Sequence, residues 1–207
     1  GQFVGYIMGS GDAVPESLRQ IGYNVDLLDP ENIVAENLSA YDAVILGIRA
    51  FNTIDRMAVI QPELMKYVES GGTVIAQYNT SMRNQPDIGP YPLSISRDRV
   101  TREEAKVTIL APDHPIIDGP NKITAADFEG WVQERGLYFP NEWDDRYTPI
   151  LAAHDPGEPD RKGGLLVGQY GKGYFVYTGY SWFRELPAGV PGAFRIFANM
   201  ISLGNDI

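Results

Sequence analysis

The chain has 207 residues, of which 43% are hydrophobic and 21% are charged, and its formal net charge is −10. This is the composition of a folded domain, far from that of a disordered chain. Because acidic residues outnumber basic ones by 27 to 17, a phosphate backbone would be repelled, and we expect no nucleic-acid partner. The chain has no cysteine, which excludes disulfides, thiolate metal sites and thiol catalysis.

The sequence also bears on membrane spans, signal peptides and a parent chain. No apolar run approaches the roughly 18 residues of a membrane span, so we predict no membrane-spanning segment. The first residues lack the basic start and long apolar stretch of a signal peptide. The sequence opens directly on a strand-like segment, as a piece of a longer protein would. We expect a longer parent chain, and a leader upstream stays open.

The first eighty residues predict alternating strands and helices. Residues 41–48 form a nearly continuous apolar run, which is typical of a parallel strand covered on both faces. Apolar side chains at helical spacing predict a helix over residues 56–69. Pro15 favours the first turn of another helix that ends at Gly22. Four strands are predicted in all, over residues 3–8, 23–29, 41–48 and 73–78.

This order predicts a flavodoxin-like, doubly wound and mostly parallel α/β sheet in a single domain over residues 1–207. An aromatic-rich excursion interrupts it over about residues 82–146, where turn residues and mixed charge point to the surface. The chain then gives a strand over 147–155, two strands around the turn "YGKG", and an amphipathic closing helix over 192–204.

Several segments carry a resemblance to known families. "YDAVILGIRAFN", "GGTVIAQYN", "DHPIIDGP" and "YGKGYFVYTGY" resemble the class I glutamine amidotransferase-like fold, in particular its ThuA-like branch of sugar-associated proteins. The segments "APDHPIIDGPNKITAADFEGWVQERGLYFPNEW" and "FRELPAGVPGAFRIFANMISLG" resemble, more closely, the accessory domain downstream of the catalytic domain in large PIG-L/LmbE-type deacetylases, which remove acetyl groups from N-acetylglucosamine-like substrates with zinc. The resemblance spans Val4 to Gly204.

The resemblance implies that Tyr78 stands where an amidotransferase carries its nucleophile, at the turn after the fourth strand. That reaction needs a thiolate, which attacks the glutamine amide to form a thioester, and a histidine partner. This chain has no thiol, and the region that matches the family's late histidine-x-glutamate pair, "YSWFREL", has Glu185 but no histidine. Glutaminase activity is therefore excluded, and we assign no catalytic residue.

We predict no metal and no cofactor. The zinc of the resembled deacetylases belongs to a separate upstream domain, and this chain has only "PDHP" in place of that domain's "HPDD"-like run. Its two histidines, His114 and His154, lie on separate segments. His114 is either a general base or a turn residue ahead of Pro115, and we favour the turn residue because no nucleophile is recognisable near it.

Polar side chains follow the third and fourth predicted strands. Arg49 and Asn52 come after the third strand, and Tyr78 and Asn79 come after the fourth. Since the carboxyl ends of parallel strands share one edge of the sheet, these residues are expected to border one crevice. A guanidinium, two amides and an aromatic face suit the hydroxyls and apolar face of a sugar.

Two residues of the excursion, Trp131 and Glu134, complete this candidate ligand site. Each has a structural alternative: Glu134 could form an ion pair with Arg49, and Trp131 could simply pack. The "GSGD" loop at 9–12 could likewise cradle a phosphate, but it lacks the spacing of a dinucleotide-binding fingerprint, and we expect a structural turn.

Three functional hypotheses follow. The first is a non-catalytic accessory domain of a carbohydrate-active, LmbE-type deacetylase protein, which binds sugar or docks against the upstream deacetylase domain of an exported parent. The second is a ThuA-like sugar-active enzyme that uses Tyr78 and carboxylates, for which Glu134 and Glu185 would have to converge. The third is a purely structural interaction module, which a filled crevice would favour.

Overall fold

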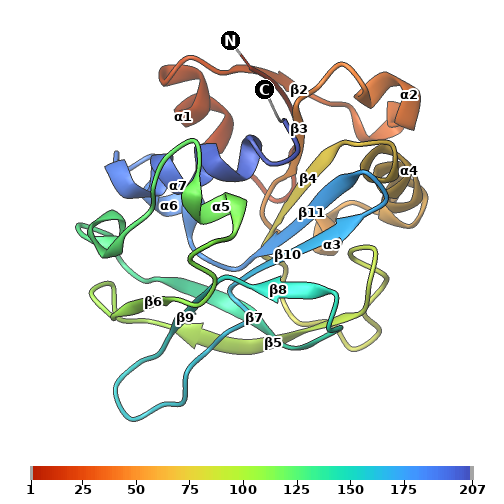
Figure 1. The fold of residues 1–207 in the computed structure, drawn as a ribbon. Coiled ribbons are helices and arrows are strands. Elements are labelled where there is room, and N and C mark those ends of the chain that lie inside the picture. Colours follow the sequence, from red (N-terminus) through yellow and green to blue (C-terminus); the bar gives the residue numbers. More distant parts are fainter. Residues whose placement is uncertain (1, 206–207) are drawn as a thin grey trace.

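The fold centres on one mixed sheet (Figure 1). The computed structural model describes residues 2–205, and their central sheet has seven strands in the order β2-β1-β3-β4-β11-β10-β8. The strands from β2 to β11 in this order are parallel, whereas β10 is antiparallel to both of its neighbours. The bounds are β1 (Phe3–Ile7), β2 (Asn24–Leu27), β3 (Ala43–Leu46), β4 (Thr73–Gln77), β8 (Tyr147–Pro149), β10 (Leu165–Tyr170) and β11 (Gly173–Thr178).

Helices cover both faces of this sheet, which explains the continuous apolar strands. All four residues of β3 are buried. One face packs against α1 (Val14–Gln20) and α7 (Pro191–Ile201), and the other packs against α4 (Met57–Glu69) (Figure 1). The short helical segments are η1 (Pro30–Asn32), α2 (Ala35–Leu38), α3 (Ala50–Thr53), α5 (Pro115–Asp118), η2 (Ala125–Phe128) and α6 (Trp182–Glu185).

The excursion over 82–146 contains an ordered ribbon. Its strands β5 (Leu93–Val100) and β7 (Gly136–Trp143) pair with each other, and β6 (Val107–Ile109) pairs with β9 (Leu151–Ala153). The amide of Leu137 in β7 donates to the carbonyl of Gly179, directly after β11, at 3.0 Å. The β5–β7 ribbon therefore lies against the carboxyl edge of the sheet, at the end away from the termini (Figure 1).

The predicted doubly wound fold is confirmed, with one difference in detail. The segment 147–155 was expected to be a single strand, but it forms β8 and β9, which have different partners. Ile150 lies between them, and its amide donates to Leu165 while its carbonyl accepts from Leu110. The chain passes from the central sheet to the small β6–β9 ribbon at this residue, a change of partner that alternation of apolar residues does not encode.

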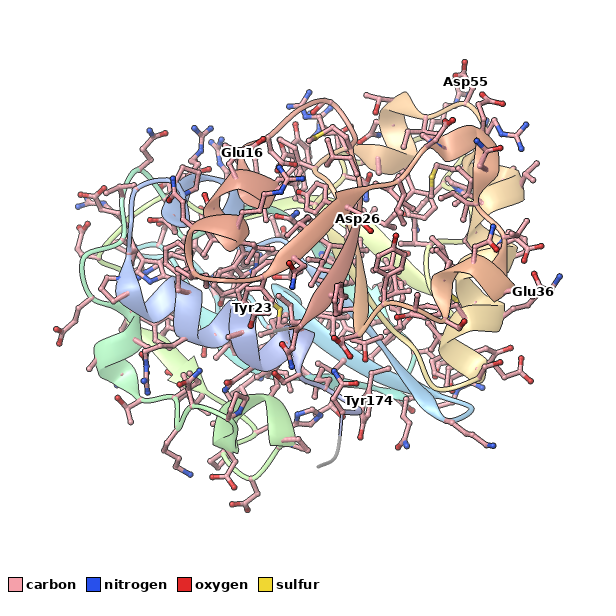
Figure 2. All side chains as sticks on the ribbon, turned by 90° about the horizontal axis from the view of Figure 1, so that it is seen from above. Glu16, Tyr23, Asp26, Glu36, Asp55 and Tyr174 are labelled. Atoms are coloured by element: carbon pink, nitrogen blue, oxygen red, sulfur yellow. The ribbon has the colours of Figure 1, made fainter. Side chains whose placement is uncertain are left out.

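The edge strands of the sheet are β2 and β8, and β2 is seen from above in Figure 2 with Asp26 labelled on it. The guanidinium of Arg19 donates to the carbonyl of Val25 through Nε at 3.3 Å and Nη2 at 2.8 Å. This contact occupies an acceptor that an added strand would need, a common way of blunting sheet edges. No helix within residues 2–205 is long and apolar enough to cross a membrane.

Candidate functional site

Arg49 and Tyr78 lie together at the carboxyl edge, as predicted. Arg49 ends the turn after β3 in a left-handed conformation, with φ of 59°. Its amide donates to the carbonyl of Tyr78 at 2.7 Å, and its Nε donates to the Tyr78 hydroxyl at 3.1 Å. The guanidinium carbon is 5.7 Å from the centroid of the tyrosine ring. An exposed arginine is thus attached to Tyr78 by its backbone and its side chain.

Tyr78 itself is covered, with only 4% of its surface exposed. The ring of Tyr138, from β7, lies nearly parallel to it, with centroids 6.0 Å apart and an interplanar angle of 11°. The ring of Phe183, from α6, covers another side at 5.4 Å. The turn after β4, where the sequence resemblance implies a nucleophile position, is therefore filled by a packed aromatic cluster.

The two asparagines of the predicted site are engaged by the protein. Asn79 is 1% exposed, and its Oδ1 accepts from the amide of Phe51 at 2.8 Å while its Nδ2 donates to the carbonyl of Gln77 at 3.3 Å. Asn52 is exposed, and its amide group exchanges hydrogen bonds with the backbone of Thr80 at 2.9 and 3.4 Å. Both side chains hold the turns after β3 and β4 together, so a ligand here would have to replace these bonds.

Trp131 and Glu134, the two site residues predicted from the excursion, both contact other side chains of the protein. Trp131 is 3% exposed and packs against Trp182, with centroids 5.3 Å apart, in the core that covers one face of the sheet. The carboxylate of Glu134 accepts from the Ser181 hydroxyl at 3.0 Å and from Arg184 Nε at 2.9 Å. The alternative prediction of an ion pair between Glu134 and Arg49 is wrong, because Glu134 forms its ion pair with Arg184. The ligand-binding role of the predicted site stays a prediction.

Asp12 settles the role of the "GSGD" loop. Its carboxylate accepts from the Tyr6 hydroxyl at 2.7 Å and from the amide of Val14, in the first turn of α1, at 2.9 Å. A second oxygen accepts from the amide of Ile48 at 3.4 Å. Amides that could cradle a phosphate are thus bound to an internal anion, and the loop is a structural turn.

The two histidines make contacts outside the Arg49–Tyr78 cluster. The Nδ1 of His114 accepts from the amide of Ile116 at 3.1 Å and so caps α5, and burial lowers the pKa of His114. His154 is exposed, with Nε2 at 3.8 Å from Asp160. In the part of the chain that the structure describes, no three histidine or acidic side chains are grouped as they would be around a metal ion.

Glu185 is enclosed, which bears on the enzyme hypothesis. The residue is 0% exposed, and its Oε1 accepts from the amide of Val132 at 2.6 Å, whereas Oε2 has no partner among residues 2–205. Burial raises the pKa of Glu185 to about 7. A pair of glycosidase carboxylates must both reach the substrate, and a carboxyl group without exposed surface does not meet this condition.

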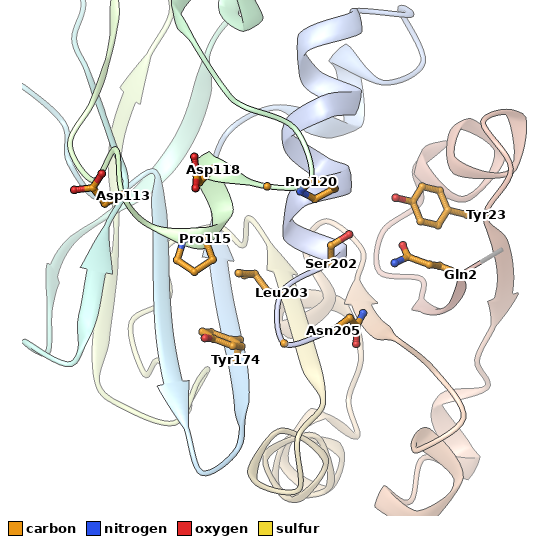
Figure 3. A pocket seen from close by; sticks show the side chains of 12 residues that line it. Gln2, Tyr23, Asp113, Pro115, Asp118, Pro120, Tyr174, Ser202, Leu203 and Asn205 are labelled. Carbon is orange, nitrogen blue, oxygen red and sulfur yellow. The ribbon is translucent and has the colours of Figure 1, made fainter. Parts of the chain in front are cut away.

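Open cavities lie elsewhere on the molecule. One of about 660 Å³ opens at the opposite, amino-terminal edge of the sheet, where Figure 3 shows Tyr23, Pro115, Tyr174 and Leu203 around it. Another, of about 510 Å³, lies beside Trp131. Neither is lined by Arg49, Asn52, Tyr78 or Asn79.

Sequence reasoning missed the two rings that close the crevice. Tyr138 and Phe183 are distant in sequence from Tyr78, and only the β5–β7 ribbon and α6 bring them to it. A partial signal existed, because Phe183 belongs to the segment "YSWFREL", which the sequence resemblance implies to lie near Tyr78 in space.

The comparisons with known proteins concern the fold. No protein-family model matches the chain, and no curated protein matches it. Among solved structures, cytoplasmic protein STM1381 from Salmonella typhimurium LT2 is 16% identical, with a TM-score of 0.63 over 96% of this chain and 98% of that one. A ThuA-like protein from Bacteroides uniformis is 14% identical, with a TM-score of 0.58 over 97% and 91%.

Larger enzymes contain the same arrangement. A cold-adapted β-galactosidase from Rahnella sp. R3 is 15% identical, with a TM-score of 0.57, and the match covers 97% of this chain but 31% of the enzyme. At these identities the likeness concerns the fold alone. With its parallel sheet, two covered faces and full-length match to the Bacteroides protein, the chain has a ThuA-like α/β fold.

Proposed function

We propose that the chain is a non-catalytic accessory domain of a carbohydrate-active protein and that it works by docking against a catalytic domain, in the first instance a LmbE-type deacetylase domain of the same parent. The observation that carries the proposal is the state of Tyr78. The sequence resemblance implies a nucleophile position there, yet Tyr78 is 4% exposed and is covered by Tyr138 and Phe183. A catalytic group must reach its substrate, and this side chain is built into the packing.

The use of this fold inside larger sugar enzymes supports an accessory role. Matches to three β-galactosidases, from Rahnella sp. R3, Bacillus circulans and Halorubrum lacusprofundi, cover 95–97% of this chain but only 30–31% of each enzyme. A domain of this size and fold therefore accompanies other parts in carbohydrate-active chains. The segments that resemble the deacetylase accessory domain give the partner that we favour.

Docking is favoured over sugar binding at the carboxyl edge because the polar groups there are already used. The amides of Asn52 and Asn79 are bonded within the protein. Large apolar side chains are exposed instead around the β2 edge: Leu27 of β2, Ile21 at the end of α1 and Phe3 of the neighbouring strand β1 are 55%, 48% and 52% exposed. Exposed apolar surface of this kind is typical of protein contacts.

The experiment is a titration of the isotope-labelled chain with a separately produced LmbE-type deacetylase domain, followed by NMR. We expect saturable shifts that include the β2 edge, and we expect the double variant Phe3→Ser, Leu27→Ser to weaken association by about tenfold or more. Val59→Ser is the matched control, because Val59 is 57% exposed but lies on α4.

The same preparation tests the enzyme hypothesis. The chain alone is expected to release no product from N-acetylglucosamine oligomers or aryl glycosides. Turnover by the chain that the substitution Tyr78→Phe abolishes would overturn the proposal. Association that is unchanged in the double variant but present in the wild type would move the docking surface away from the β2 edge.

A further inference from the structure

The cavity of about 510 Å³ beside Trp131 has a floor and a rim of different chemistry. Phe128, Trp131 and Arg135 contribute to its floor, and all three are nearly buried, at 4%, 3% and 4% exposed. Four charged side chains that line the cavity form its exposed rim, and these are Glu103, Glu104, Lys106 and Glu129. The site lies between the start of β6, η2 and the segment ahead of β7, apart from the Tyr78 cluster.

Arg135 is a buried cation that interacts with the charges of Glu103, Glu104 and Glu185 but is hydrogen-bonded to none of them. Its Nε donates to the carbonyl of Ala105 at 3.0 Å, and its Nη1 donates to the carbonyl of Phe128 at 2.6 Å. The guanidinium carbon is 5.3 Å from the centroid of Trp131. No carboxylate of residues 2–205 comes within ion-pair distance of it, and Nη2 has no hydrogen-bond partner there. Arg135 lines the cavity, so Nη2 is the guanidinium nitrogen that is free to bond to a ligand there.

Two buried polar groups near Arg135 are also incompletely bonded. The Tyr180 hydroxyl and Glu185 Oε2 have no partner within the described chain, and both groups interact electrostatically with Arg135. Neither residue lines the cavity, so these two groups form a polar interior behind Arg135 and are not contacts of a ligand in the cavity. The guanidinium of Arg135 does line the cavity; an acceptor there would complete its hydrogen bonds, and a carboxylate fits its geometry and charge.

The charges of the rim determine what the outer part of a ligand must carry. It has three carboxylates and one ammonium group, so its charge is negative overall and would repel a ligand that is only an anion. Glutamates accept hydrogen bonds, and Glu104 and Glu129 are exposed toward solvent. The outer part of the ligand must therefore carry donors, and a cation suits it best.

We propose that this cavity binds a small zwitterion, an α-amino acid with an apolar side chain. Its carboxylate would accept from Nη2 of Arg135, its ammonium would lie toward Glu104 and Glu129, and its side chain would contact Phe128 and Trp131. A free amino acid satisfies the floor, the rim and the charge balance together. A simple carboxylate or a simple amine satisfies one of the two charges and is repelled at the other.

Ligands that differ from leucine by one charged group distinguish binding of a zwitterion from binding of a simple carboxylate or amine. Leucine is compared by calorimetry and NMR with 4-methylpentanoate, which lacks the ammonium, with 3-methylbutylamine, which lacks the carboxylate, and with glucose. We expect leucine to bind at least about tenfold more tightly than any of the other three. No saturable binding of leucine, or equal binding of 4-methylpentanoate, overturns the proposal.

Substitutions at other residues test whether leucine binds in this cavity. Arg135 is left unchanged because it is buried and hydrogen-bonded to the backbone. Ala125 lines the cavity and is exposed, so Ala125→Trp should block it and reduce leucine affinity about tenfold or more. Ala126→Trp is the control, because Ala126 is the exposed neighbour that does not line the cavity. Glu129→Gln should weaken leucine but not 4-methylpentanoate. Equal loss in both alanine variants, or none in Ala125→Trp, contradicts this placement. The docking titration with the deacetylase domain is independent of these results.

Discussion

At the scale of single residues, the side chains of Arg49 and Tyr78 at the carboxyl edge contact each other and the rings that cover Tyr78. Arg49 has φ of 59°, a conformation that non-glycine residues rarely adopt, yet its side chain is bound to Tyr78. Strain of this kind often marks functional sites. Here the Arg49–Tyr78 contact and the covering rings of Tyr138 and Phe183 account for it structurally.

A pair of substitutions at Arg49 separates these contributions. Arg49→Ala removes the hydrogen bond to Tyr78 but keeps a side chain in the left-handed region, and we expect it to lower the free energy of unfolding by about 1 to 2 kcal/mol. Arg49→Gly loses the same bond but tolerates this φ, so it should be more stable than the alanine variant by about 1 kcal/mol. Urea denaturation measures both. Equal stabilities of the two variants would show that the backbone there is unstrained.

Glu185 predicts a pH dependence of stability. Burial holds its pKa at about 7 in the folded chain, above the ordinary value of 4.5. The unfolded chain therefore releases the proton first as pH rises, so the stabilising contribution is complete below about pH 4.5 and is lost as pH rises through about 7. Arg135 opposes this shift, while Glu134 and Glu103 reinforce it.

The variant Glu185→Gln keeps an acceptor for Val132 but does not titrate. Relative to this variant, the wild type should lose about 2 to 3 kcal/mol of unfolding free energy between pH 4.5 and 8. The quantity to measure is the difference between the two proteins in urea denaturation at several pH values, because other carboxylates cancel in it. A difference that stays constant with pH would mean that Glu185 is ionised in the folded chain.

At the scale of elements, apolar runs predicted strands and helices well, but not how distant segments meet. The helix predicted over 56–69 appears as α4, and the "YGKG" turn joins β10 to β11. The pairing of β5 with β7 and the change of partner at Ile150 depend on contacts far apart in sequence. Periodicity cannot show such contacts, and so the sequence did not reveal that a ribbon closes the crevice.

The attachment of α5 to α7 provides a test at this scale. Asn199 of α7 is 0% exposed, and its Nδ2 donates to the carbonyls of Ile116 at 2.8 Å and Asn121 at 2.7 Å. Its Oδ1 accepts from the amide of Asn121 at 2.9 Å. Asn199→Leu would leave one buried and two partly buried backbone groups without this partner, and we expect a loss of about 2 to 3 kcal/mol in unfolding free energy.

The control for Asn199 is Asn37→Ala, because Asn37 is an exposed residue of the short helix α2. It should change the unfolding free energy by less than about 0.5 kcal/mol. If Asn199→Leu were as mild as this control, the contacts between α7 and the segment 115–121 would not contribute to stability in the way described.

At the scale of the whole molecule, the sequence predicted the doubly wound sheet and the edge at which its side chains gather. It placed Arg49, Asn52, Tyr78 and Asn79 correctly at one edge, because parallel strands share their carboxyl ends. It could not predict whether that edge is open, since openness depends on Tyr138 and Phe183 from other elements. Two open cavities lie away from that edge, one at the opposite edge and one beside Trp131.

The central claim is that Tyr78 belongs to the packing and not to a working site. Thermal and urea denaturation of the wild type, Tyr78→Phe and Tyr78→Ala, each with and without a panel of N-acetylglucosamine oligomers and simple sugars, tests it in one series. We predict a loss of about 1 kcal/mol for Tyr78→Phe and about 3 to 5 kcal/mol for Tyr78→Ala, with no sugar-induced stabilisation that depends on Tyr78. A saturable sugar-induced rise in melting temperature that vanishes in a Tyr78→Phe variant of unchanged stability would contradict the claim.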